Sequence, residues 1–199
     1  MSKERNKIYV PLIIGIIMVI VFQILGVFFS SFIFSMTVLF PGILIIVLGA
    51  IIMLFFTIRY SVKRVKENKV QSFLPLMLNA LILALIFFNP FNCMIQYAEF
   101  SIKYNARMEA IHSYYDGELV KAKESVYSYS LKGNQFLSDG NEIIKAGDKV
   151  LFFTVRGVLD NFSGYVYSPD GTPPSEEDVQ ADFLERRKVH EHWYYIVCT

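Results

Sequence analysis

Two long runs of this chain contain no Asp, Glu, Lys, Arg or His, and they constrain its fold more than any other feature. The first extends from Ile8 to Ile58 and the second from Val70 to Ala98. A helix of about 20 uncharged apolar residues is long enough to cross the roughly 30 Å hydrocarbon core of a bilayer. The first run has room for two such helices, with its most polar interval at Ser30 to Thr37. We therefore expect an anchor over residues 1–97 with three transmembrane α-helices, near residues 8–29, 38–58 and 73–93.

The basic residues beside these runs predict the orientation of the anchor. Lys and Arg near the ends of spans collect on the cytoplasmic side. Three of them precede the first expected span, five lie in the loop 59–69, and none lies in the interval 30–37. The first apolar stretch is also too long for a cleaved signal peptide and lacks a small-residue cleavage site, so we expect it to be retained. The pattern predicts a multi-pass plasma-membrane protein with a cytoplasmic N-terminus and an extracytoplasmic C-terminal domain.

The expected outer part of the chain is acidic, because it holds 16 of the 18 acidic residues and only 11 of the 19 basic ones. Nucleic-acid binding requires clustered Lys and Arg that neutralise phosphates. The charge distribution therefore argues against a nucleic-acid partner. The expected partners are the lipid bilayer and another membrane or secreted protein.

The polar residues inside the apolar runs are uncharged, which argues against transport by this chain alone, because ion and proton paths use ionisable groups. Asn79 lies beside the small residues Ala80 and Ala84. This spacing favours close helix packing, either within the chain or with another membrane protein. The segment Asn89 to Asn92 contains Pro90, so we expect a bend there.

Residues 98–199 have the pattern of a small α+β domain. Apolar residues recur at helical spacing from Phe100 to Tyr115, and Gly117 is the expected end of that helix. Glu99 and Lys103 form an i,i+4 pair that we place on another face of the helix. The expected strands are Ser125 to Leu131, one beginning at Glu142, Val150 to Arg156, Phe162 to Ser168, and a last one within His190 to Cys198.

The connections complete this prediction. Val150–Arg156 and Phe162–Ser168 are separated by five residues with turn chemistry, which is typical of a β-hairpin. The segment 175–187 favours a short helix with Ser175 as its N-cap. We therefore expect a helix packed on an antiparallel sheet of four or five strands.

Few residues of this domain suggest chemistry. His190 and His192 have the spacing of two residues on one face of a strand, but no third ligand accompanies them, so solvent-facing or structural histidines are the simpler interpretation. Asp160 and Asn161 lie in the hairpin connection, where turn chemistry alone explains them. Trp193 fits either a core or a recognition surface. These five residues are the candidate interaction residues, and no catalytic, metal or cofactor site is expected.

The two cysteines, Cys93 and Cys198, are both on the expected outer side. They could pair, but their different expected depths favour two free thiols.

The sequences LSDGNEI (137–143), VLFFTVRGVLDNFSGYVYS (150–168) and HWYYI (192–196) resemble the C-terminal domain of small, uncharacterised membrane proteins of Gram-positive bacteria. The resemblance covers roughly residues 125–199 and depends chiefly on RGVLDNFSG (156–164). It implies a bacterial plasma membrane and an extracytoplasmic domain, and it implies no activity.

The expected function is that of a membrane-anchored, non-enzymatic protein whose outer domain binds a partner, as an accessory or immunity-type protein. An enzyme acting at the cell envelope, with Asp160, His190 and His192 as its first candidates, is the alternative. A subunit of a transporter complex is another.

Overall fold

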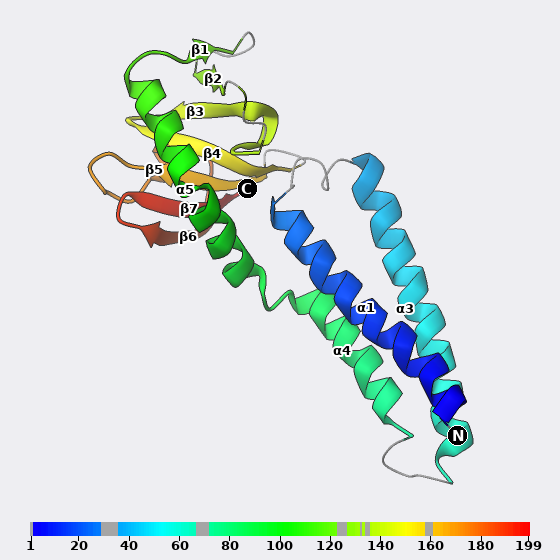
Figure 1. The fold of residues 1–199 in the computed structure, drawn as a ribbon. Helices are drawn as coiled ribbons and strands as arrows, with labels where there is room; N and C mark the ends of the chain where they lie inside the picture. Colours follow the sequence, from blue (N-terminus) through cyan, green and yellow to red (C-terminus); the bar gives the residue numbers. More distant parts are fainter. Residues whose placement is uncertain are drawn as a thin grey trace. The chain divides into compact units, whose positions relative to one another are not determined.

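The computed structural model describes residues 2–28, 36–66, 72–122, 127–131, 133, 136–157 and 161–199. The chain divides into two compact units, and the second contains the C-terminal part from Met94 onward. We call helix α5 (Asn92–Tyr115) and the strands that follow it the sheet domain. Figure 1 shows the helices and strands of each unit.

The first unit consists of three apolar helices, α1 (Ser2–Phe28), α3 (Met36–Arg64) and α4 (Leu74–Phe88). Two segments are long and apolar enough to cross a membrane, Tyr9–Phe28 with a mean hydropathy of 2.8 and Leu44–Arg64 with 2.2. A third candidate arises if α4 and the following helix form one bent span. The part of the chain that the structure describes therefore contains two or three such helices, where the sequence predicted three.

Polar groups in this unit bond to neighbouring helices. Asn79 is 1% exposed and its Nδ2 donates to Thr57 Oγ1 at 3.4 Å. Gln23 Nε2 donates to the Leu85 carbonyl at 2.7 Å. The first of the two interpretations of Asn79, packing within the chain, is therefore the one that the structure supports.

The expected bend at the Asn-Pro segment is confirmed. Helix α4 ends at Phe88, and Asn89 adopts the left-handed conformation with φ 37° while its N–H donates to the Leu85 carbonyl. A new helix, α5 (Asn92–Tyr115), begins two residues after Pro90. The third expected span, 73–93, is therefore not a single helix.

Helix α5 buries the predicted stripe against the sheet. Phe100 and Ile111 are 2% and 1% exposed, and Tyr104 and Met108 pack against the same core, whereas Tyr115 is half exposed. The helix ends where Gly117 takes a φ of +73°, a conformation that glycine adopts without strain.

Among the described residues the sheet has seven antiparallel strands in the order β1-β2-β3-β4-β5-β7-β6, where four or five were expected. The hairpin of β4 and β5 is confirmed, with Arg156 opposite Phe162. The strands are β1 (Val120–Lys121), β2 (Ser128–Ser130), β3 (Glu142–Ala146), β4 (Lys149–Arg156), β5 (Phe162–Tyr167), β6 (Phe183–His190) and β7 (Trp193–Cys198).

The structure corrects the sequence-based prediction at strands β6 and β7. The expected helix 175–187 ends early, because α6 covers only Glu176–Val179 and Gln180 turns left-handed at φ 55°. The rest of that segment enters β6. The expected last strand is divided as well, since His190 ends β6 and Trp193 begins β7.

Both faces of the sheet are covered by other parts of the domain. One face, with Phe152, Tyr165 and Trp193, packs on α5 (Figure 1). The opposite face, with Leu151, Val166 and Ile196, meets the segment that contains α6. The domain therefore has two hydrophobic core clusters, one on each face of the sheet.

Strand β6 forms one edge of the sheet and is irregular. Its pairing with β7 shifts register between Phe183 and Glu185 and again between Lys188 and His190, so Leu184 and Val189 lie in bulges. Leu184 is 70% exposed.

Candidate binding site

An open groove lies beside α6, on the face of the sheet opposite α5. Its volume is about 940 Å³. We call it the α6 groove. It is lined by Ile144, Phe153, Arg156, Gly157, Asn161, Phe162, Glu176, Glu177, Val179, Gln180, Ala181, Asp182 and Thr199.

Arg156, Gly157, Asn161 and Phe162 line one end of this groove. The Arg156 guanidinium carbon lies 4.3 Å from the centre of the Phe153 ring, and Phe162 packs edge-on against the same ring at 5.3 Å. The Gly157 N–H donates to the Asn161 carbonyl at 2.7 Å. A Cβ on Gly157 would lie 2.6 Å from that carbonyl oxygen, so a glycine is required for this close approach.

Gly164 is a second point of close approach. It lies opposite Phe153, where the β4–β5 register shifts, and a Cβ there would lie 2.4 Å from the Phe152 carbonyl oxygen and 2.8 Å from Leu151. Gly157 and Gly164 are thus both required to be glycine, each because a Cβ would clash with a different backbone carbonyl oxygen.

Helix α6 forms the other wall of the groove and is fixed at both of its ends. Ser175 and Asp178 make a reciprocal capping box, in which the Asp178 N–H donates to Ser175 Oγ at 3.2 Å and the Ser175 N–H donates to Asp178 Oδ2 at 2.8 Å. Beyond the helix, the Phe183 N–H donates to Glu176 Oε1 at 3.2 Å.

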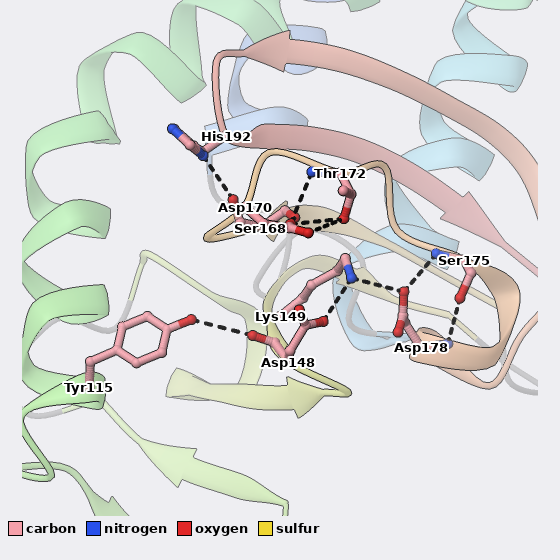
Figure 2. A network of polar contacts seen from close by, with 9 residues as sticks. All are labelled: Tyr115, Asp148, Lys149, Ser168, Asp170, Thr172, Ser175, Asp178 and His192. Atoms are coloured by element: carbon pink, nitrogen blue, oxygen red, sulfur yellow. Dashed lines mark hydrogen bonds and ion pairs between the residues drawn. The ribbon is translucent and has the colours of Figure 1, made fainter.

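A network of polar contacts ties α6 to the turn between β3 and β4 (Figure 2). The Lys149 ammonium, on a side chain 7% exposed, lies 2.7 Å from Asp148 Oδ1 and 3.3 Å from Asp178 Oδ2. Burial alone lowers the pKa of Lys149, but the bonds to these two carboxylates outweigh burial and raise it. A Cβ on Gly147, which has a φ of +64°, would lie 2.7 Å from Asp178 Oδ1.

The same network includes the loop that leads to α6 (Figure 2). Asp170 accepts hydrogen bonds from Ser168 Oγ at 2.7 Å and from the Thr172 N–H at 3.0 Å. These bonds lower the pKa of Asp170 well below its usual value. The Asp170 carboxylate therefore links residues at both ends of this turn by hydrogen bonds.

The rim of the α6 groove is acidic. Glu176, Glu177 and Asp182 are exposed there. Arg156, the one basic side chain among the described residues that line the groove, is paired with Glu142, whose Oε1 lies 2.5 Å from the Arg156 Nη1. Burial raises the pKa of Glu142, but hydrogen bonds from Ser128 and Arg156 outweigh it and lower the pKa. Because Arg156 is paired, the acidic side chains of the rim make the electrostatic potential at the mouth of the groove negative. The floor below them is apolar and includes Phe153 and Phe162.

The structure separates the residues that the sequence singled out. Asn161 lines the α6 groove, and Asp160 lies outside the described residues. His190, His192 and Trp193 are at the opposite end of β7 from Cys198, the residue that pairs with Phe162. Five residues of strand correspond to about 17 Å. Asn161 and the histidines therefore do not share one site.

His190, His192 and Trp193 each contact other residues of the sheet domain. The His190 ring packs on Tyr104 at 4.9 Å, and His192 Nδ1 lies 3.0 Å from the Ser168 carbonyl oxygen (Figure 2). His192 belongs to the turn after β6, so the two histidines do not share a face of one strand. Trp193 is 1% exposed and packs on Phe152 and Tyr167 in the core.

No group of three His, Cys, Asp or Glu side chains among the residues that the structure describes could hold a metal ion. Cys93 and Cys198 are both free, the first exposed and the second buried.

A buried ionic cluster on α5 contains the predicted Glu99–Lys103 pair, but the sequence did not predict its burial or the participation of Arg107. Glu99 Oε1 accepts from Arg107 Nη2 at 2.7 Å and lies 2.8 Å from the Lys103 ammonium, and the Glu99 and Arg107 side chains are 2% and 1% exposed. The Arg107 guanidinium carbon lies 4.4 Å from the centre of the Tyr165 ring. A signal was present in the spacing, because residues 99, 103 and 107 recur every four positions beside the apolar stripe.

The cluster continues into a hydrogen-bonded chain. Tyr165 Oη donates to the Gln96 carbonyl at 2.9 Å, and Gln96 Nε2 donates to Tyr195 Oη at 3.0 Å. Arg187 donates to the Gln96 side-chain oxygen. Burial raises the pKa of both Tyr165 and Tyr195, so the two hydroxyls are neutral and serve as hydrogen-bonding groups.

Comparison with known proteins gives no match for this chain, whether with family models, with curated proteins or with solved structures.

Proposed function

We propose that this protein is anchored in a plasma membrane by its apolar helices and binds a partner through the α6 groove of an extracytoplasmic sheet domain. The observation that carries the proposal is the groove itself, with an apolar floor and an acidic rim on a domain whose other face is filled by α5. It would act as an accessory or immunity-type protein without catalysis of its own.

The exposed surface of the first unit supports the membrane part of this proposal. Within each of the two candidate spans only 11% of the most apolar 18-residue window is buried. Ile45 and Phe55, for example, are 68% and 60% exposed. Surfaces of this size and polarity are stable in lipid but not in water. The distribution of Lys and Arg favours the cytoplasmic N-terminus, and the resemblance of residues 125–199 favours a bacterial membrane.

The chemistry of the groove favours a positively charged polypeptide segment with an apolar anchor. Glu176, Glu177 and Asp182 would attract Lys and Arg side chains and speed their approach. Phe162, which is partly exposed above the buried Phe153 ring, offers an aromatic surface to an apolar side chain. The partner would therefore be a protein or peptide rather than a nucleic acid.

Backbone pairing at the sheet edge is a less suitable mode of binding for this domain. Strand β1 has two residues, and β6 carries two bulges that interrupt a regular ladder. An added strand requires a continuous edge. The side-chain groove is consequently the better site.

The test is recovery of partners from native membranes. The tagged full chain is cross-linked in its source cells, extracted in mild detergent, purified and analysed by mass spectrometry. The double variant Glu177→Lys/Asp182→Lys reverses the rim charge at two exposed positions. The control Glu109→Lys/Asp116→Lys makes the same change of charge at exposed positions of α5 and its end.

We expect a stoichiometric partner with the wild-type chain and with the control, and a loss of at least about tenfold with the groove variant, which corresponds to about 1.4 kcal/mol. Equal recovery from both variants would exclude the groove as the site. Absence of any partner of the wild-type chain would overturn the binding function.

A further inference from the structure

The outward-facing residues of α5 change character partway along the helix. From its start to Ile102 they are apolar or small, and the large ones are highly exposed, with Met94 at 71%, Tyr97 at 61% and Ile102 at 71%. Beyond Ile102 the exposed positions are Asn105, Glu109 and His112, followed by Tyr115 at the last residue of the helix. The change occurs within one turn.

The charged residues of α5 itself at the level of this apolar surface face inward. Glu99 and Lys103 lie in the same three turns as Tyr97 and Ile102, and their side chains are 2% and 15% exposed. A helix on the surface of a water-soluble domain has the opposite arrangement, with its charges outside. Outward apolar residues and inward, paired charges are the arrangement expected in lipid.

The length of α4 supplies a second, independent observation. Its 15 residues extend about 22 Å at about 1.5 Å per residue, which is about 8 Å less than the hydrocarbon core of a bilayer. The charge-free run of sequence continues past α4 as far as Ala98. The missing length corresponds to about five helical residues.

We propose that the outer face of α5 from Met94 to Ile102 is embedded in the membrane, so that the first turns of α5 complete the crossing that α4 begins. We call this surface the lipid collar. Its occupant is lipid, with Tyr97 suited to the interface, where aromatic hydroxyls concentrate. The collar rests on the membrane placement proposed above.

The collar gives a reason for the buried ionic cluster. A Glu or Lys on this part of α5 could not remain ionised against acyl chains without an internal partner. The pairing of Glu99 with Lys103 and Arg107 keeps all three charges inside the protein at that depth. The cluster therefore lets the charged sheet domain begin within the membrane rather than above it.

Depth-dependent quenching tests the collar. The full chain with Cys93→Ser and Cys198→Ala receives one new cysteine at Met94, Tyr97, Ile102, Glu109 or His112. Each variant is labelled with bimane and reconstituted in phosphatidylcholine vesicles with or without bromine on the acyl chains. Ile45 in α3 is the reference position for the membrane placement itself. The fluorescence of Trp193, the single tryptophan, verifies that each unlabelled variant is folded.

We expect brominated lipid to quench Met94, Tyr97 and Ile102 to an extent comparable with Ile45, and to leave Glu109 and His112 unchanged. Quenching at Ile45 without quenching at Tyr97 and Ile102 would overturn the collar and leave the membrane anchor intact. Absence of quenching at Ile45 as well would overturn the anchor. Labels at Tyr97 and Ile102 that neither lipid nor a water-soluble quencher reaches would mean that protein covers the surface, and the collar would be wrong.

Discussion

The Arg107 guanidinium donates to the Glu99 carboxylate at 2.7 Å while neither side chain is more than 2% exposed. Two ions that are both removed from water depend on each other, because the loss of one leaves the other buried and uncompensated. We expect Glu99→Leu to destabilise the sheet domain by about 3–5 kcal/mol, since Lys103 and Arg107 then lose their shared anion.

The measurement is denaturant unfolding of the full chain in mild detergent, followed by Trp193 fluorescence. Glu109→Leu, at an exposed position of the same helix, should change stability by no more than about 0.5 kcal/mol. The double variant Glu99→Leu/Arg107→Met should be more stable than the sum of the two single losses predicts. A loss for Glu99→Leu no greater than that of the control would refute this account of the cluster.

The bridge between Lys149 and Asp178 makes stability depend on pH at both extremes. Partial burial raises the pKa of Asp178, but the bonds from Ser175 and Lys149 outweigh it and lower the pKa. The contribution of Asp178 is therefore present above its unfolded pKa of about 3.9 and is lost as pH falls through its lower folded value. The raised pKa of Lys149 acts in the opposite sense, so its contribution is present below about 10.4 and is lost as pH rises through the folded value.

Asp178→Asn should consequently lower the Tm at pH 7, by an amount that corresponds to about 1 kcal/mol, and the difference from the wild-type chain should shrink as pH falls below about 4. Thermal unfolding from pH 3 to pH 7 measures it. Glu109→Gln is the control with the same change of charge. A difference that stays constant over this range would show that the carboxylate is not involved.

Gly164 should tolerate no side chain. In Gly164→Ala the new Cβ would lie 2.4 Å from a backbone oxygen of Phe152, which cannot move without disturbing the β4–β5 pairing. We expect a loss of about 2–3 kcal/mol in unfolding free energy. The neighbouring change Ser163→Ala removes a 2.8 Å contact with Thr154 but creates no clash, and it should cost about 1 kcal/mol. Equal losses for the two variants would contradict the steric argument.

Cys198 should be a slow thiol. Burial, with a smaller effect of Glu176, raises its pKa to about 11. In the variant Cys93→Ser, we expect Cys198 to react with iodoacetamide at pH 8 at least about 100-fold more slowly than the new cysteine of a variant that also carries Cys198→Ala and Thr199→Cys. The reason is that the thiolate fraction of Cys198 is small and its sulfur is covered. Rates measured by mass spectrometry decide this. Similar rates would mean that the C-terminal end of strand β7 opens readily.

The sequence predicted those features that depend on local pattern. Charge-free runs indicated the apolar helices, Pro90 the break before α5, and Ser175 the cap of α6, because each follows from the chemistry of a few neighbouring residues. Glu99 and Lys103 form the predicted pair, but on the buried face rather than on another one. Spacing shows which residues are near each other on a helix and does not show how wide a face the sheet will cover.

The features that the sequence predicted wrongly or did not predict share one cause, because they depend on tertiary contacts rather than on local pattern. The segment 183–190 is polar and rich in Glu, Arg and Lys, which resembles a solvated helix, yet it forms β6 because pairing with β7 satisfies its backbone. The two-residue strand β1 has no pattern of its own. The α6 groove brings together residues from Ile144 to Thr199, and such a site depends on topology that periodicity does not contain.

The two bulges of β6 have a consequence for copies of this protein that crowd together. A regular edge strand is a template on which the edge of a neighbouring sheet can pair, and continued pairing leads to fibrils. Leu184 and Val189 interrupt that template at both ends of β6, and Arg186, Arg187 and Lys188 add like charges between them. At this edge the domain is thereby protected against edge-to-edge aggregation at high local concentrations.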